Sequence, residues 1–509
     1  MKRIYLINTL FTALLALATT GCTDLVPVDS SEINTSNFPS TEADIESRVM
    51  SCYYPLRGNW WDGIFTPSER GVMFVNDCTT GILTGNFGAQ KMASELNFYP
   101  ESEEITWFYY KRDEPNGYAN KVSRCTLVLD EIEHSTIDEK AKAKYMAEVK
   151  CARAFLSYIL YDMYGPLVVP PLEVLKNPLD EKPLPRLERA EMVKFIEDDL
   201  KFAADNLPVN PEYGRFSSGL AHMLLIRLYL HETAVDKSYF AKVETEAREL
   251  MKAKYGYGLQ ADYNKMFELG GQGQGNKEII YAIPCSYDGP NYNQWHMMVL
   301  PTDFQQNGMS GGWGTVTSTW YFYQSFEAND VRRAKLLTSY TNSAGETVDK
   351  DTPQSPLAAG PIALKIGYDS KVSGSGGYSD IDLILFRYAD VYLSLAEALC
   401  QKTGATAADL KEAASYVNVI RNRAGLGNLK PEDYATSDKL LDAILNERWH
   451  EFWCENGQFR ADLIRYHRLI PLVKKINQSP YAENYKELYP LPLSVISDGK
   501  GEVKQNPNY

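Results

Sequence analysis

Hydrophobic positions recur at helical spacing along much of the chain. Over residues 144–166 apolar side chains return every three or four positions, and Gly165 and Pro166 end the run. Residues 217–234 show the same spacing behind a serine that can cap a helix, and 239–253 repeat it after a short turn. This pattern predicts a mostly helical, all-α protein.

A third helix pair is predicted over residues 386–404 and 410–426, and Gly404 ends the first of these two segments. Helix pairs with alanine and glycine at close crossings and aromatic rings between them are typical of tetratricopeptide-like units. The spacing of the pairs is irregular, and long stretches intervene. We therefore expect an irregular array of helix pairs rather than a continuous solenoid.

The pattern changes between about residues 266 and 379, where glycine, serine, asparagine and proline dominate and only a short strand, 278–284, is predicted. Long loops inside a helical domain are usually functional or disordered, and the many tryptophans and tyrosines here argue against disorder. The predicted organisation is one domain over residues 41–509, with a helical scaffold at about 41–265 and 380–475, a loop-rich ligand region at about 266–379 and a C-terminal tail at about 476–509.

The N-terminus has the layout of an export signal. Lys2 and Arg3 precede an apolar run over residues 7–18, which is short for a membrane span, and small residues then lead to Cys22. A cleavage zone that ends on cysteine resembles the lipobox of bacterial lipoproteins, although Thr19 stands where leucine is usual. We predict a signal peptide over 1–21, lipidation at Cys22 and a tether over 22–40. An ordinary signal peptide with a chance cysteine is the alternative.

Composition narrows the class of ligand. The chain has 509 residues and a net charge of -14, which argues against binding to nucleic acid because phosphate contacts need clustered lysine and arginine. Its 34 tyrosines exceed what a core alone requires. Rings with a polar tip suit surfaces that meet both water and apolar groups.

Several motifs resemble those of the SusD/RagB family of Bacteroidetes outer-membrane lipoproteins. In chain order they are AEVKCARAFLSYILYDMYGPLVVP, YGRFSSGLAHMLLIRLYL, FRYADVYLSLAEAL, VNVIRNRAGL, ILNERWHEFWCENGQFRADLIRY and the ending LYPLPLSVISDGKGEVKQNPNY. The resemblance implies a helical fold of tetratricopeptide-like pairs with a looped ligand face, anchored in the outer membrane and facing the medium. It also implies capture of an oligosaccharide, a SusC-like TonB-dependent transporter as partner, and no enzymatic activity.

Two alternatives stay open beside this reading. Some members of the family capture peptides, so a RagB-like peptide-binding protein is the second hypothesis. A glycoside hydrolase is the third, because such enzymes use paired carboxylates. With 66 acidic residues, however, pairs arise by chance, and no feature of the sequence isolates two of them in a cleft.

The charged residues of the signature motifs are interpreted as structural. Bidentate arginine–carboxylate pairs can lock one helix to the next. The arginines and carboxylates concerned are Arg421, Arg423, Arg460, Asp462, Arg465 and Glu397, with Glu447, Glu451 and Asp390 as expected partners.

The predicted glycan site consists of aromatic loops. The apolar C–H face of a sugar stacks on a flat ring, while amides and carboxylates bind its hydroxyl groups. Trp313, in the bare loop MSGGWGTVT, and Trp295, between amide side chains, are the expected stacking platforms. The expected walls are Trp61, Phe87 and Trp320, and the expected polar contacts are Asn86 and Asp77.

A calcium site is left open in the loop over residues 368–382. Asp369, Asp380 and Asp382 offer the oxygen ligands that calcium prefers, but their spacing is not that of an EF-hand. No other metal or cofactor is expected.

Overall fold

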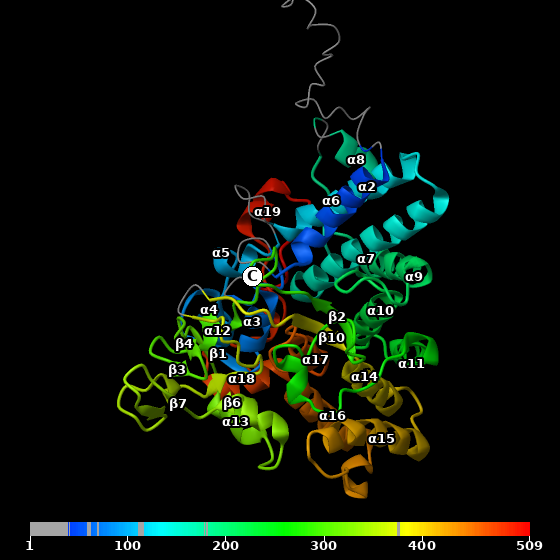
Figure 1. Ribbon diagram of the computed structural model, residues 1–509. Coiled ribbons are helices and arrows are strands. Elements are labelled where there is room, and N and C mark those ends of the chain that lie inside the picture. Colours follow the sequence, from blue (N-terminus) through cyan, green and yellow to red (C-terminus); the bar gives the residue numbers. More distant parts are fainter. Residues whose placement is uncertain are drawn as a thin grey trace, which may run out of the picture.

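The computed structural model describes residues 39, 41–58, 63–68, 71–109, 117–177, 179, 182–373 and 377–509. They form a mostly helical molecule with a few short strands, which confirms the predicted fold class (Figure 1). The longer helices are α2 (Glu42–Tyr53), α6 (Tyr118–His134), α7 (Glu139–Tyr164), α9 (Arg189–Asn206), α10 (Ser218–Glu232), α11 (Tyr239–Leu250), α14 (Tyr388–Gln401), α15 (Ala407–Arg423) and α16 (Ser437–Glu451).

Shorter elements complete the fold. The short helices are α3 (Val72–Cys78), α4 (Gly88–Glu95), α5 (Glu103–Thr106), α8 (Leu172–Lys176), α12 (Trp295–Val299), α13 (Trp320–Ser325), α17 (Phe459–Arg465), α18 (Leu469–Asn477) and α19 (Leu493–Asp498). The strands are β1 (Leu83–Gly85), β2 (Ile279–Ile283), β3 (Gln305–Gln306), β4 (Met309–Ser310), β5 (Val316–Ser318), β6 (Leu336–Leu337), β7 (Ser339–Thr341), β8 (Thr347–Asp349), β9 (Ile362–Ala363) and β10 (Leu383–Arg387). They pair two by two in antiparallel ladders.

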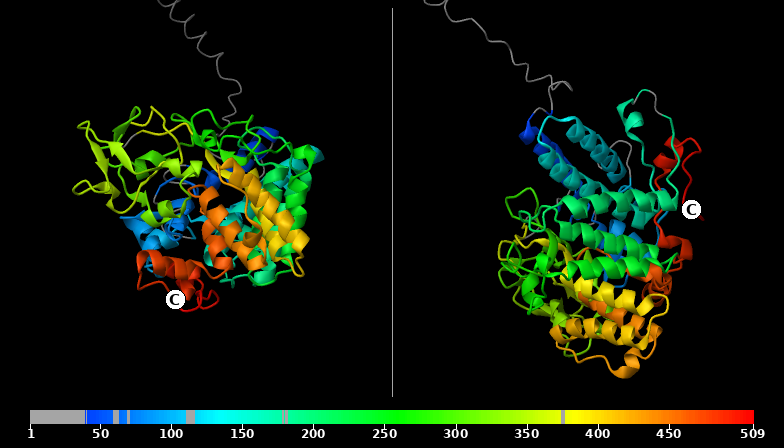
Figure 2. Two further views of the ribbon diagram at one scale, coloured as in Figure 1. Left: turned by 90° about the horizontal axis from the view of Figure 1, so that it is seen from below. Right: turned by 90° about the vertical axis from the view of Figure 1, so that its right-hand side faces the viewer.

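The long helices stack into an array in chain order. Helix α6 packs on α7, α7 on α9, α9 on α10, α10 on α11, α11 on α14, and α14 on both α15 and α16. Figure 2 shows this stack from the side, with colours running from cyan through green and yellow to orange. The array confirms the prediction of tetratricopeptide-like helix pairs.

Local sequence signals set where these helices begin and end. The Asp138 carboxylate accepts hydrogen bonds from the first backbone N–H groups of α7, and Gly165 ends that helix with φ at 77°. The Ser217 hydroxyl caps α10 by accepting from Leu220 N. Because such signals lie within a few residues of each helix end, they can be recognised in the sequence.

A long excursion leaves the array and returns to it. Strands β2 and β10 pair antiparallel, with Leu383 opposite Ile283, so the chain over 284–382 departs and returns at one place. Helices α11 and α14, on either side of this excursion in sequence, pack directly together. Figure 2 shows the excursion on one side of the array and the C-terminal tail on the opposite side.

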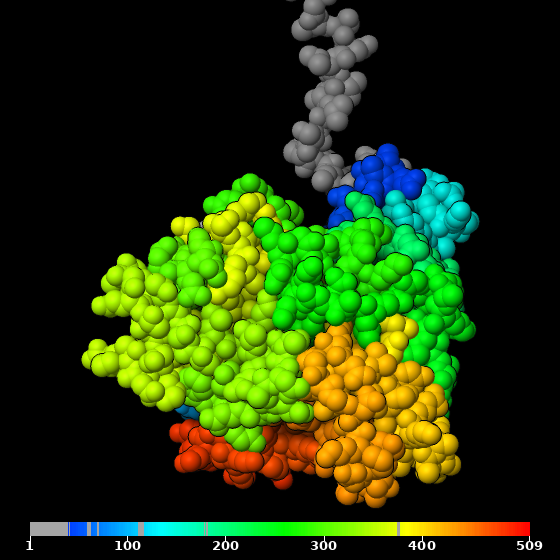
Figure 3. All heavy atoms as spheres, turned by 60° about the horizontal axis from the view of Figure 1, so that its bottom comes forward, coloured from blue at the N-terminus to red at the C-terminus, as the bar shows by residue number. Residues whose placement is uncertain are grey.

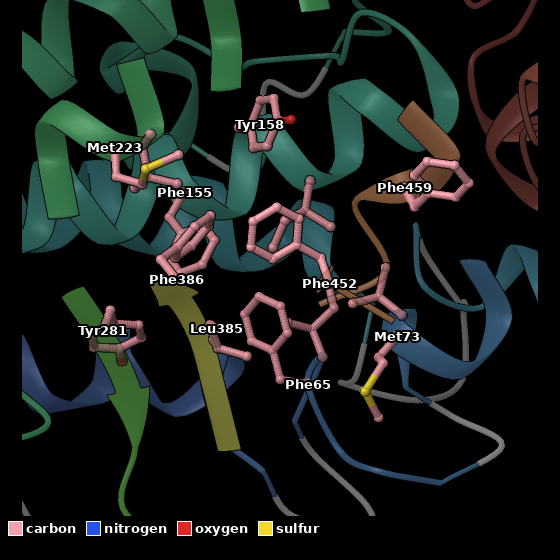
Figure 4. Packing of buried hydrophobic residues seen from close by; sticks show 14 of the residues in the cluster. Phe65, Met73, Phe155, Tyr158, Met223, Tyr281, Leu385, Phe386, Phe452 and Phe459 are labelled. Atoms are coloured by element: carbon pink, nitrogen blue, oxygen red, sulfur yellow. The ribbon is translucent and has the colours of Figure 1, made fainter. Parts of the chain in front are cut away.

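Buried aromatic rings hold the β2–β10 ladder against the array. The Phe155 ring of α7 lies 5.6 Å from that of Phe386 on β10 and 6.3 Å from that of Tyr281 on β2, and Phe65 packs on it at 5.3 Å (Figure 4). Each such ring removes a large apolar area from water, which is worth about 2 kcal/mol or more. The base of the excursion is therefore fixed to the scaffold.

Among the described residues, none of the helices combines the length and the apolar character needed to cross a bilayer. Cys151 and Cys400, which the helical pattern predicts to be small core residues, are both buried as free thiols.

Candidate functional site

The β1–β5 ladder brings Trp313 and Phe87 to one surface. The backbone N–H of Asn86 donates to the Thr315 carbonyl at 3.0 Å, and its side-chain amide donates to the Gly314 carbonyl at 3.2 Å. The residue before Phe87 is thus tied to the residue after Trp313. The Trp313 ring is 43% exposed and Phe87 is 66% exposed. We name Asn86, Phe87 and Trp313 the aromatic surface.

Glycines place the Trp313 backbone directly against α12. The Trp313 N–H donates to the Met297 carbonyl at 2.7 Å. A Cβ atom on Gly312 would lie 2.5 Å from that same oxygen, which is too close for any other residue. Gly314 has φ at 59°, in the left-handed region that favours glycine. The bare loop therefore gives Trp313 a close backbone support rather than freedom to move.

A tyrosine cluster lies at the other end of the same support. The rings of Tyr292 and Tyr378 stack with centroids 4.3 Å apart, and Tyr287, which is exposed, packs against Tyr378 at 6.1 Å. A bridge between Asn293 and Ser379 aligns the two segments. Helix α12 then leads from this cluster to Met297, which binds the Trp313 backbone. Sequence reasoning missed these tyrosines because only the fold brings the two segments together, although both lie in glycine-rich stretches.

The prediction that Trp295 is a stacking platform is wrong. Its side chain is completely buried, its indole N–H donates to the Ala363 carbonyl at 2.8 Å, and its ring stacks on Phe74. The neighbouring amides are buried too: Asn293 Oδ1 accepts from the Trp295 N–H. Trp295 is a core residue that holds α12 in place.

The prediction that Asp77 contacts the ligand is also wrong. Asp77 is 1% exposed and lies in α3, where one carboxylate oxygen accepts from Cys454 N at 2.8 Å. Burial raises the pKa of Asp77 to about 7, against smaller lowering effects of that hydrogen bond and of Lys365. The carboxyl group is part of the core and cannot reach a sugar.

Trp320 is half-buried at the start of α13. Its indole N–H donates to the Leu357 carbonyl at 3.0 Å, so it is not available to a ligand hydroxyl. That the Trp320 ring forms a wall of the glycan site stays a prediction. Trp61 and Cys22 lie outside the described residues.

Comparisons with known proteins agree on one family. The family model described as "SusD family" matches residues 362–509. SusD-like protein P2 of Formosa agariphila is 25% identical over 85% of this chain and 86% of its own length. The starch-binding protein SusD of Bacteroides thetaiotaomicron is 22% identical over 82% of this chain and 80% of its own. The chain is similar to proteins of the SusD family over most of its length.

Solved structures of this fold superpose over nearly the whole chain. A SusD superfamily protein from Bacteroides vulgatus has a TM-score of 0.75 at 19% identity, over 93% of this chain and 100% of its own. Surface glycan-binding protein A from Bacteroides thetaiotaomicron, solved in complex with laminarihexaose, has a TM-score of 0.71 at 20% identity, over 92% of this chain and 100% of its own. The aromatic surface lies outside the segment that the SusD family model matches.

The SusD signature motifs build the scaffold, as interpreted from the sequence. Glu451 is fully buried and binds three arginines: Arg332 at 3.0 Å, Arg387 at 2.8 Å, and Arg423. Burial alone would raise the pKa of Glu451, but the three positive charges lower it overall. Arg423, expected to pair with one of the carboxylates Glu447, Glu451 and Asp390, pairs with Glu451.

A second buried cluster centres on Asp462. Its carboxylate accepts from Arg448 Nε and Arg465 Nη2, each at 2.7 Å, and from Arg227 Nη2 at 3.2 Å. Arg465 also pairs with Glu397. These groups join α10, α14, α16 and α17, so they fix the helices to one another.

The aspartates of the 368–382 loop are already engaged within the chain. Asp369 accepts from Ser379 Oγ at 3.0 Å, Asp380 from the Tyr287 N–H at 2.6 Å, and Asp382 from the Cys285 N–H at 2.9 Å. In the part of the chain that the structure describes, no group of three or more histidine, cysteine or acidic side chains is arranged to hold a metal ion. These aspartates shape the loops around the tyrosine cluster.

Proposed function

We propose that this chain is a surface glycan-binding lipoprotein, held in the outer membrane through Cys22, that hands oligosaccharides to a SusC-like TonB-dependent transporter. The observation that carries the proposal is the aromatic surface: two exposed rings on a rigid support, with an amide between them. Similarity to a family that includes a starch-binding protein, and a similar fold in a protein solved with laminarihexaose, support the same ligand class.

The geometry suits a sugar ring. Trp313 and Phe87 offer flat apolar faces for the C–H side of a pyranose, at little cost in side-chain entropy. Asn86 uses one amide hydrogen on Gly314 and retains its second N–H and its carbonyl oxygen for hydroxyl groups. Tyr287, Tyr292 and Tyr378 supply further rings at the other end of α12.

A panel of neutral glycans and unstructured peptides can decide which class of ligand the protein binds. We expect the purified protein without its signal peptide to bind at least one neutral glycan from a set containing starch, laminarin, xylan and mannan, measured by isothermal titration calorimetry. We expect no binding to a pool of unstructured peptides, because the surface is made of rings rather than of exposed strand edges.

The same experiment can contradict the proposal. Binding to peptides alone would establish the RagB-like alternative. Release of shorter sugars from a bound glycan, detected by chromatography after long incubation, would show an enzyme instead of a binding protein.

A further inference from the structure

A groove of about 390 Å³ lies between α16 and the α17–α18 turn, closed at one end by α13. Figure 3 shows these segments meeting at the lower edge of the molecule, in orange, red and yellow-green. It shares no residue with the aromatic surface or the tyrosine cluster. The lining residues are Tyr321, Asp442, Leu445, Asn446, Trp449, Phe459, Leu463, His467, Arg468, Pro471, Leu472 and Lys475.

Two helix faces make the walls of this groove. The α16 residues lie three or four positions apart, from Asp442 to Trp449, and the α18 residues Pro471, Leu472 and Lys475 follow the same spacing. The Trp449 and Phe459 rings stack with an interplanar angle of 15° and form an apolar floor. The base of the groove is therefore aromatic, with Trp449 8% and Phe459 4% exposed.

Two donors beside this floor, the Trp449 indole N–H and the Lys475 ammonium, have no acceptor among the described residues. Trp449 is 8% exposed, and no described group accepts its indole N–H. The Lys475 ammonium lies 5.1 Å from the centroid of the Tyr321 ring, and no carboxylate in the described part of the chain pairs with it. Asp442, the one carboxylate of the lining, is already paired with Arg468 at 2.6 Å. An occupant must therefore bring its own acceptor.

We propose that this groove binds a small amphiphilic carboxylate, with a planar apolar body on the Trp449–Phe459 floor and its carboxylate at Lys475. Burying the apolar body is favourable in proportion to the apolar area that is removed from water. The carboxylate would accept charge-assisted hydrogen bonds from the Lys475 ammonium. The volume falls within the range of small-molecule sites.

The test uses trans-cinnamate, with neutral cinnamamide as the ligand control, and measures binding by calorimetry. We expect cinnamate to saturate one site and to bind at least fivefold more tightly than the amide. Lys475→Gln should remove this preference. Lys474→Gln is the matched control, since Lys474 is exposed on the same helix but does not line the groove. It should leave binding within twofold of the unchanged protein.

Several results would overturn this proposal. These are an absence of saturable cinnamate binding, equal affinity for the amide, or the same loss of affinity in both lysine variants. Because Lys475 is exposed, its variant should fold, which a melting curve checks. Glycan binding at the aromatic surface should be unchanged in Lys475→Gln, so failure of either proposal leaves the other testable.

Discussion

Asp77 carries a carboxyl group whose buried surroundings disfavour its ionised form. Its pKa is about 7 in the folded protein, against an ordinary value of 3.8. Between these two pH values the unfolded chain is ionised while the native protein keeps the proton. Folding therefore takes up a proton in this window, and the contribution of Asp77 to stability falls as pH rises, by about 1.4 kcal/mol per pH unit.

The variant Asp77→Asn cannot ionise, so it should lack this pH dependence. We expect the melting temperature of the variant, relative to the unchanged protein, to rise steadily as pH increases from 5 to 7. Thermal melts of both proteins across that range measure the difference. Parallel pH profiles would contradict the assignment of the shift to Asp77.

The residues that flank a side chain in the sequence predict its exposure to solvent only in part. The loop around Trp313 and the Asn86–Phe87 dipeptide do lie at the surface, as predicted from their flanking glycines. Trp295 has equally polar neighbours but fills the core, since Ala363, far along the chain, accepts its indole N–H. Burial of a single side chain depends on such distant partners, which no local window contains.

At the scale of elements, Glu451 joins parts of the chain that local signals do not connect. It binds Arg387 at the end of β10, Arg423 at the end of α15, and Arg332 of the excursion. Removing one partner from such a buried cluster leaves uncompensated charge, which costs about 3 kcal/mol or more. The cluster thus fixes the base of the excursion to the helical array.

We expect Glu451→Gln to lower the free energy of unfolding by at least about 3 kcal/mol in urea melts. Glu432→Gln, at an exposed acidic residue, is the control and should change stability by less than about 0.5 kcal/mol. An equal effect of both substitutions would show that the buried cluster contributes no special stability.

Helices could be predicted because their periodicity and caps are local, and α7 and α10 lie where the pattern indicates. Strand pairing could not, since β1 pairs with β5 across more than two hundred residues of chain. For the buried ion pairs, the helix motifs indicated Glu451 and Arg423 as partners. They gave no indication of Arg332, which lies outside those motifs, or of Arg387, which lies within FRYADVYLSLAEAL but far from Glu451 in the sequence.

The whole molecule combines a fixed helical array with one long excursion that carries exposed rings. The array, the aromatic supports under β2 and β10, and the buried charges all act to hold the excursion in place. On this account specificity belongs to the excursion and to the loop that pairs with it, whereas the SusD signature residues serve the scaffold. Binding should therefore be separable from stability.

The most direct test is calorimetric titration of Trp313→Ala with the best glycan of the panel. We predict at least about tenfold weaker binding, equivalent to about 1.4 kcal/mol, with a melting temperature within about 2 °C of the unchanged protein. Tyr481→Ala, a ring of nearly equal exposure outside the aromatic surface, should leave affinity unchanged. Unaltered affinity in Trp313→Ala, or an equal loss in Tyr481→Ala, would contradict the aromatic surface as the binding site.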